Sequence, residues 1–409
     1  MTMSSISPQV KNFRPEIQAL RALAVLLVVA YHLEPSVVPG GYIGVDIFFV
    51  ISGFLITSHL LREAERTGRV SLPNFFAGRA RRILPAAMLV ILAVVAASFL
   101  ILPKTLWGEL GTQAIASAFS VQNWVLAADS VDYLAADQAP GPLQHFWSLG
   151  VEEQFYLFWP LLVLSACLMA KPGPDASGAD AFAPRRRMLW TLFGAATLLS
   201  LGYSAFAGYS GNSAGYFITT TRIWELAVGG LLALAVQAHA NGALKLPAWV
   251  TSWQARNLAV LAALAAICFA AFSYDALTVF PGIAASIPVL GCAVVIAAGS
   301  TRGPGSLHPL VNWAPVQWVG LASYSLYLWH WPLIVFYIEL AGSEPGPMQS
   351  LALLAGSLLL AWASLTWVET PARHFRPIAS SPARSLLAGA VMVGLAASIA
   401  LLPGAMQQQ

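Results

Sequence analysis

The sequence predicts an all-α integral membrane protein, a bundle of ten core transmembrane helices followed by an eleventh, C-terminal helix. Charged residues make up only 10% of the 409 positions and apolar residues make up 58%, whereas soluble globular domains carry about 25% charged residues. The net charge of +3 is small, and no basic run is interleaved with aromatic residues. A nucleic-acid partner is therefore not expected, and membrane lipid is the expected surrounding of the chain.

A spanning helix needs about 20 mostly apolar residues, and the sequence offers eleven such stretches separated by turn-rich or charged breaks. They cover residues 17–33, 43–61, 83–102, 147–169, 188–207, 217–238, 256–273, 279–298, 316–341, 348–368 and 384–403. The first stretch lacks a small-residue cleavage site and is expected to stay attached. The stretch 112–128 is interrupted by Gln122 and Asn123, so we expect an interfacial segment there rather than a span.

The positions of Lys and Arg predict the orientation, because these residues concentrate in cytoplasmic loops. With the N-terminus inside, the inner loops collect nearly all cations, and the outer segments carry mainly carboxylates with Lys104 as their only plain cation. The inner cations include Lys11, Arg62, Arg66, Arg69, Lys171, Arg185, Arg186, Arg187, Lys245 and Arg302, and the outer carboxylates include Glu34, Glu109, Asp129, Asp132, Asp137 and Glu344. Eleven spans that start inside then leave the C-terminus, Gln409, outside.

The first span carries two ionisable residues on one face. The eleven-residue step from Arg21 to His32 is three helical turns plus about 20°, and Arg14 lies seven residues below Arg21. The rise puts His32 roughly 16 Å further along the helix than Arg21. Asp46, across a short loop, is expected at the depth of His32, where a carboxylate would orient a general base. The alternative is that Arg21 reaches lipid phosphates and His32 caps the helix in interfacial water.

The fourth span opens with carboxylates among aromatic residues. Glu152 and Glu153 lie one or two turns into the span, flanked by Trp147 and Tyr156. An interfacial aromatic belt needs no carboxylates, so we expect catalytic support from the glutamates and sugar binding by the aromatic rings. Ser52, in the second span, is more simply explained by close helix packing.

Polar groups also recur in later spans and in one inner loop. Arg222 and Glu225 are three residues apart and form either a structural ion pair or a substrate site. Tyr327 and His330 are candidate substrate contacts, with a neutral core histidine as the alternative for His330. In the inner loop after the second span, Arg79 and Arg82 share a helical face and are candidates for binding phosphates, although an arginine there is also a topogenic signal.

In this order, the motifs resemble the membrane acyltransferase-3 family of bacterial O-acyltransferases. The resemblance covers about residues 12–377 and rests on the spacing of Arg21 and His32 and on GGYIGVDIFFVISGFLIT, RARRILP, HFWSLGVEEQFYLFWP and SYSLYLWHWP. It implies ten core helices in a bacterial inner membrane, a cytoplasmic acyl-CoA donor, usually acetyl-CoA, and an acceptor hydroxyl at the outer face. It also implies that Arg21 with His32, and Arg79 with Arg82, are the family's paired functional residues.

The resemblance divides the chain into a cytoplasmic tail (1–11), an acyltransferase-3 membrane domain (12–377), and an additional helix with a short outer tail (378–409). Many relatives with an eleventh helix continue into an outer SGNH domain, so a separate or missing SGNH domain is an expected partner. Cys167, Cys268 and Cys292 lie in apolar runs, and no metal site is expected.

We therefore expect O-acetylation of a cell-envelope glycan, such as lipopolysaccharide or another surface polysaccharide, at the outer face. His32 acts as a general base or carries the acyl group, supported by Asp46, Glu152 or Glu153. Acyl-CoA is the donor, with its phosphates on Arg79, Arg82 and either Arg21 or Arg14. A proton-coupled glycan or lipid transporter is the alternative from another class, and an assembly scaffold is a third interpretation.

Overall fold

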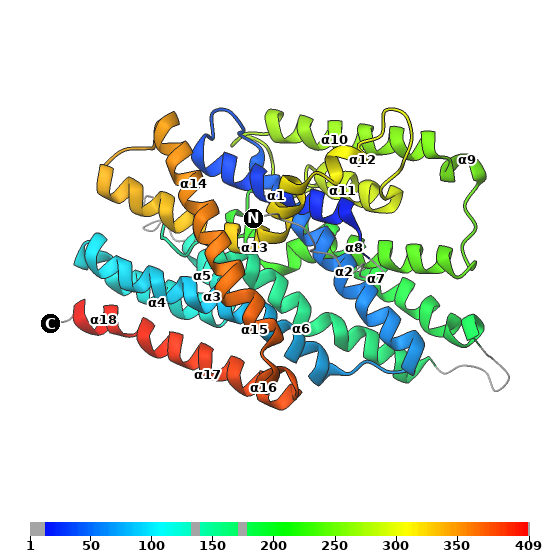
Figure 1. Ribbon diagram of the computed structural model, residues 1–409, viewed down its shortest axis with the longest axis horizontal. Coiled ribbons are helices and arrows are strands. Elements are labelled where there is room, and N and C mark those ends of the chain that lie inside the picture. Colours follow the sequence, from blue (N-terminus) through cyan, green and yellow to red (C-terminus); the bar gives the residue numbers. More distant parts are fainter. Residues whose placement is uncertain (1–12, 132–139, 171–177, 408–409) are drawn as a thin grey trace, which may run out of the picture.

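The computed structural model describes residues 13–131, 140–170 and 178–407, which form a bundle of helices with no strand among them (Figure 1). The long helices are α1 (Pro15–Leu33), α2 (Gly44–Thr67), α3 (Leu72–Ile101), α6 (Phe146–Met169), α7 (Gly178–Tyr209), α8 (Thr219–Ala240), α10 (Trp253–Ser273), α13 (Ala314–Ala341), α14 (Pro347–Ser364) and α17 (Pro382–Ala400). The short helices are η1 (Gly41–Ile43), η2 (Lys104–Leu106), α4 (Trp107–Ala118), α5 (Gln122–Asp129), η3 (Ser213–Tyr216), α9 (Ala248–Thr251), α11 (Ser286–Ala298), α12 (His308–Val311), η4 (Leu365–Glu369), α15 (Thr370–His374), α16 (Arg376–Ala379) and α18 (Leu402–Gln407).

Nine helical segments in the described ranges are long and apolar enough to cross a membrane, which supports a multi-pass membrane protein. Two of the eleven predicted spans are not among them. The predicted span 279–298 contains only the 13-residue α11. The predicted span 316–341 is the 28-residue α13, in which Ser, Tyr, His and Pro residues lower the mean hydropathy.

The stretch 112–128 does not form a spanning helix, as its polar interruptions predict. It is divided between α4, with 12 residues, and α5, with 8 residues. Ser120 adopts a positive φ of 58° between them and turns the chain. α4 packs along α17 and α18, so this stretch joins the bundle through the C-terminal helices.

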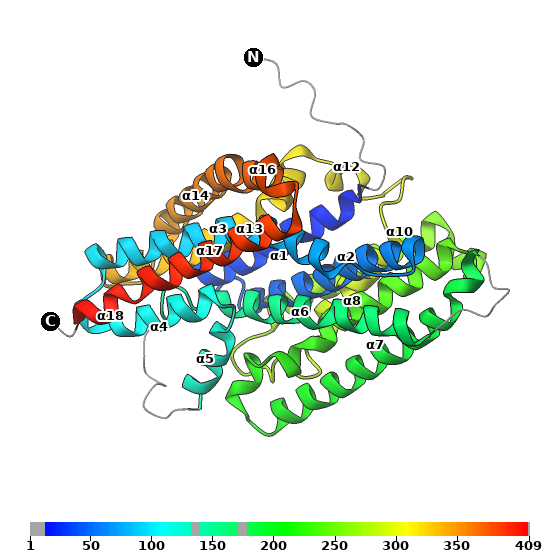
Figure 2. The ribbon, with the colours of Figure 1, turned by 90° about the horizontal axis from the view of Figure 1, so that it is seen from below.

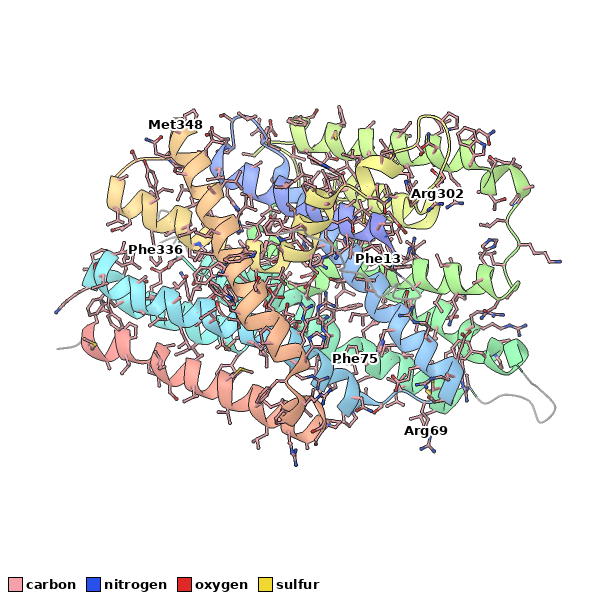
Figure 3. The ribbon with its side chains drawn as sticks, viewed as in Figure 1. Phe13, Arg69, Phe75, Arg302, Phe336 and Met348 are labelled. Carbon is pink, nitrogen blue, oxygen red and sulfur yellow. The ribbon has the colours of Figure 1, made fainter. Side chains whose placement is uncertain are left out.

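Residues of predicted inner loops and residues near a predicted outer loop lie toward opposite ends of the bundle. Figure 3 places Phe13, Arg69 and Arg302 toward the right of the bundle and Phe336 and Met348 toward the left. Arg69 and Arg302 belong to predicted inner loops, whereas Phe336 and Met348 lie near a predicted outer one. The tail 1–11, residues 171–177 of the linker, Asp132, Asp137 and Gln409 lie outside the described residues.

The helices that carry the predicted site residues lie inside the bundle. Seen from below, α7 runs along one side and α14 along the other, with α1, α2, α6 and α13 between them (Figure 2). α2 packs on α8 and α1 packs on α13. Gly53 explains the first contact, because a methyl group there would overlap the backbone of Leu226.

Candidate active site

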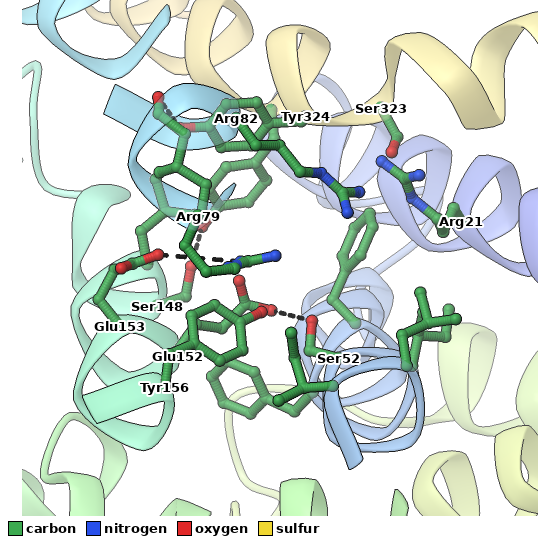
Figure 4. Close-up of a pocket in the computed structure, with 18 of the residues that line it drawn as sticks. Arg21, Ser52, Arg79, Arg82, Ser148, Glu152, Glu153, Tyr156, Ser323 and Tyr324 are labelled. Carbon is green, nitrogen blue, oxygen red and sulfur yellow. Dashed lines mark hydrogen bonds and ion pairs between the residues drawn. The ribbon is translucent and has the colours of Figure 1, made fainter. Parts of the chain in front are cut away.

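A cavity of about 480 Å³ lies between α1, α2, α3, α6 and α13 (Figure 4). This volume falls within the roughly 300–1,000 Å³ of typical ligand sites. Apolar side chains of α2 and α3 line one part, and charged and hydroxyl groups line the rest. The polar and charged lining consists of Arg21, Ser52, His59, Asn74, Arg79, Arg82, Ser148, Glu152, Glu153, Tyr156, Ser323, Tyr324 and Tyr327.

Three guanidinium groups turn into this space (Figure 4). Arg79 lies over the Tyr156 ring at 3.9 Å from its centroid and reaches Glu153 at only 3.9 Å. Arg21 donates to the neutral Gln18 side chain at 3.0 Å. Arg82 forms no hydrogen bond or ion pair within the described chain. Like charges repel one another, and Arg21 and Arg82 have no ion-pair partner within the described chain, so this part of the cavity is a candidate site for an anion.

The carboxylates occupy the side of the cavity formed by α6. Ser52 donates to Glu152 at 2.6 Å, so the serine that packing alone would explain also holds a carboxylate in place. Glu153 faces Arg79 across 3.9 Å. Both predicted glutamates therefore line the cavity with the arginines, and neither hydrogen-bonds His32.

His32 lies beside another histidine. Its Nδ1 is 3.0 Å from Nε2 of His330, and the two rings are stacked with centroids 5.2 Å apart. The Trp331 ring packs against His32 at 4.5 Å. The predicted pairing of His32 with Asp46 is wrong, because Asp46 lies on the face of α2 that packs against α8 and its carboxylate pairs there with Arg222 at 3.3 Å.

The histidine pair and the cavity share one layer of side chains. Tyr327 lines the cavity, and its ring centroid is 5.5 Å from that of His330. Its hydroxyl lies 2.6 Å from the Ser148 hydroxyl and donates to the His145 carbonyl at 2.8 Å. His32 itself does not line the cavity, so the site has two parts: a charged cavity and a histidine pair behind Tyr327.

His145 is a further buried residue of this layer, and the sequence alone did not mark it as functional. Pro332 has no N–H, so the Leu328 carbonyl four residues before it lacks a helical donor. His145 Nε2 donates to that carbonyl at 3.1 Å. One sequence pattern could have pointed to His145: its spacing of three and four residues from Ser148, Glu152 and Tyr156 puts all four on one face of α6.

A model of the family described as "Acyltransferase domain" matches residues 14–366. The chain belongs to this acyltransferase family. The match covers most of the chain, including every residue that lines the cavity and both histidines of the pair. The resemblance drawn from the motifs is therefore confirmed, and the family is an acyltransferase family rather than a transporter family.

Curated bacterial relatives of this acyltransferase family member are similar over most of its length. The peptidoglycan O-acetyltransferase OatA of Listeria monocytogenes is 32% identical over 89% of the chain and 56% of its own length. The O-acetyltransferase OatA of Staphylococcus aureus is 32% identical over 96% of the chain and 63% of its own. The putative peptidoglycan O-acetyltransferase YrhL of Bacillus subtilis is 32% identical over 79% of the chain and 49% of its own length. The chain thus spans about half to two thirds of these relatives. No solved structure matches it.

In this family member, Arg222 and Glu225 form a buried ion cluster apart from the cavity. Arg222 lies 2.9 Å from Glu225 and 3.3 Å from Asp46, and all three side chains are fully buried. The Trp147 ring packs over the guanidinium at 5.6 Å. None of these four residues lines the cavity, so the structure favours the structural alternative over substrate binding for Arg222, Glu225 and Trp147.

Arg14 is also placed away from the cavity. Its Nε donates to Glu16 at 2.6 Å, and its Nη2 donates to the Ile296 carbonyl at the end of α11. Arg14 precedes the first turn of α1 and has an extended backbone, so it does not lie on the helical face that carries Arg21. Arg14 therefore joins α1 to α11 and does not line the cavity.

Replacing Arg222 with methionine should lower stability by about 3–5 kcal/mol, because it leaves two carboxyl groups buried without a cation. Thermal unfolding of the purified protein in detergent measures the effect. The triple variant R222M/D46N/E225Q, in which the whole cluster is neutral, should recover a large part of the loss. A single variant as stable as the parent chain would show that the cluster is not held together by its charges.

Proposed function

We propose that the chain transfers an acetyl group from acetyl-CoA to a hydroxyl of a cell-envelope glycan. The observation that carries this proposal is the pair Arg21 and Arg82, which face one cavity without a carboxylate partner. Guanidinium groups bind phosphates through paired hydrogen bonds. Acetyl-CoA brings phosphates and a thioester together, and the apolar lining from α2 and α3 suits its uncharged arm.

The proposed donor enters from the cytoplasm and the acceptor from the opposite face. This sidedness follows from the cations of the predicted inner loops, such as Arg69 and Arg302, which lie toward one end of the bundle (Figure 3). α1 is continuous from Pro15 to Leu33, so Arg21 and His32 are roughly 16 Å apart along the bundle. The membrane is the bacterial inner membrane in this proposal.

The acceptor class follows from the relatives. Two of them are named for peptidoglycan O-acetylation, one as a putative enzyme. We take a glycan of that kind as the acceptor, presented free or lipid-linked near His32. The side chain of His32 is partly exposed, whereas His330 is fully buried. Of the two rings, His32 is the one that an acceptor hydroxyl can reach.

The proposed reaction uses His32 as general base. His32 takes the proton of the acceptor hydroxyl, and the hydroxyl oxygen bonds to the thioester carbonyl carbon. The carbon–sulfur bond breaks, and the departing CoA thiolate receives the proton from the imidazolium. The products are the glycan acetyl ester and CoA. Tyr327 and Ser148 lie between the cavity and the histidines. In this proposal the acetyl group passes these two side chains on its way from the cavity to the acceptor.

The test uses the purified full chain in lipid vesicles with labelled acetyl-CoA and soluble peptidoglycan fragments. We expect CoA thiol release that depends on the fragments, together with labelled ester on the glycan. The transporter alternative predicts movement of glycan across the vesicle wall without thioester cleavage. Glycan transport with intact acetyl-CoA would overturn the proposal.

A further inference from the structure

His330 has a fixed proton position. Its Nδ1 lies 2.7 Å from the Tyr327 carbonyl oxygen and 3.3 Å from the Leu326 carbonyl oxygen. Carbonyl oxygens only accept hydrogen bonds, so Nδ1 of His330 carries a proton. A neutral imidazole has one N–H, and Nε2 of His330 is therefore an acceptor.

The proton on Nδ1 of His330 determines which nitrogen of His32 carries a proton. Nε2 of His330, an acceptor, is 3.0 Å from Nδ1 of His32, so His32 must donate from Nδ1. The second nitrogen of His32, Nε2, is then unprotonated. No described residue forms a hydrogen bond with that nitrogen, and the side chain is partly exposed.

We propose that His330 is the positioning residue that holds His32 in the tautomer with a free Nε2, the atom that takes the acceptor proton. The inference rests on the proposed function, in which His32 is the general base. A base in many enzymes is oriented by a third group bonded to its other nitrogen. Here that group is a buried neutral imidazole, anchored in turn by the backbone of α13.

The surrounding rings fix the orientation as well as the tautomer. Trp331 packs on His32 at 4.5 Å between ring centroids, and Tyr31 packs on it at 5.2 Å. His330 is fully buried, and its ring lies 5.8 Å from that of His145. His145 donates to the Leu328 carbonyl, so it does not compete for the nitrogen that faces His32.

The test compares His330→Phe, His330→Gln and His32→Ala with the parent chain by steady-state kinetics. His330→Phe keeps a ring but removes the acceptor, so kcat should fall about 10- to 100-fold, as for other orienting residues. The KM for acetyl-CoA should stay unchanged, because the arginines are untouched. His330→Gln offers an amide oxygen near the lost nitrogen and should recover most of the kcat. His239→Gln, at an exposed histidine of α8 that only contacts the Leu244 carbonyl, is the matched control.

The outcomes separate the inference from the proposed function. If the parent chain shows no turnover with acetyl-CoA and peptidoglycan fragments, the proposed function fails. If His32→Ala retains full turnover, the general-base role of His32 fails, and the positioning role of His330 fails with it. If His32→Ala is inactive but His330→Phe keeps its kcat, only the positioning role fails, and the same holds if His330→Gln is as slow as His330→Phe. Nitrogen-15 NMR of histidine-labelled parent protein covers the case in which the variants do not fold. A proton on Nε2 of neutral His32 would overturn the inference directly.

Discussion

Replacing His32 with alanine should lower kcat for glycan O-acetylation by about 10²–10⁴-fold, the usual contribution of a general base. The loss should appear with little change in the KM for acetyl-CoA. His32 does not line the cavity that holds the arginines, so its removal affects the proton transfer and leaves donor binding intact. Acetyl ester on peptidoglycan fragments and released CoA, both measured under saturating donor, report the effect.

The control for this variant is binding of CoA itself. The His32→Ala protein should bind CoA with the parent affinity by calorimetry, and it should elute as one peak in gel filtration. Turnover at the parent rate, at equal amounts of folded protein, would rule out His32 as the base. Loss of both turnover and CoA binding would instead point to collapse of the contact between α1 and α13.

The second large effect is expected on donor binding. Arg82→Ala removes a guanidinium that no described carboxylate or hydrogen-bond partner neutralises, so the ligand should be its main partner. A hydrogen bond to a charged group contributes about 1.5–3 kcal/mol, which corresponds to a rise of roughly 10- to 100-fold in the KM for acetyl-CoA. The KM of Arg82→Lys for acetyl-CoA should lie between those of the parent and of Arg82→Ala, because lysine keeps the charge but lacks the planar guanidinium.

Arg81→Ala is the matched control for Arg82. It is the neighbouring residue of α3, but it donates to Ser385 of α17 at 2.6 Å and does not line the cavity. Its KM for acetyl-CoA should equal that of the parent. S-acetylpantetheine, a donor without phosphate, gives the second control, because parent and Arg82→Ala should use it equally well. A similar loss with both donors would place Arg82 near the thioester instead of the phosphates.

The first helix shows how far helical periodicity carries a prediction. The eleven-residue spacing put Arg21 and His32 on one face, and α1 is a continuous helix over both. Arg21 does line the cavity, with Arg79 and Arg82 from α3. The same periodicity misplaced Arg14, because the helix begins at the next residue and periodicity ends where the helix does.

The partner of His32 could not be found by the same means. Depth along the membrane made Asp46 a candidate, since both residues lie near the loop that joins α1 to α2. Depth does not determine direction, however, and Asp46 faces Arg222 on α8. The actual partner, His330, is 298 residues away in sequence, and only the packing of α1 on α13 brings the two rings together.

The sequence by itself determined what depends on neighbouring residues: the apolar helices, the breaks between them, the family, and the residues that share one helical face. These features follow from local hydropathy and from a period of about 3.6 residues. The tertiary structure alone decided which faces meet. It divided the predicted polar residues into a cavity with three arginines, a histidine pair, and the buried cluster around Arg222. The physical reason is that Asp46 and His32 are satisfied by partners on other helices, Arg222 and His330, and no local pattern records such contacts between helices.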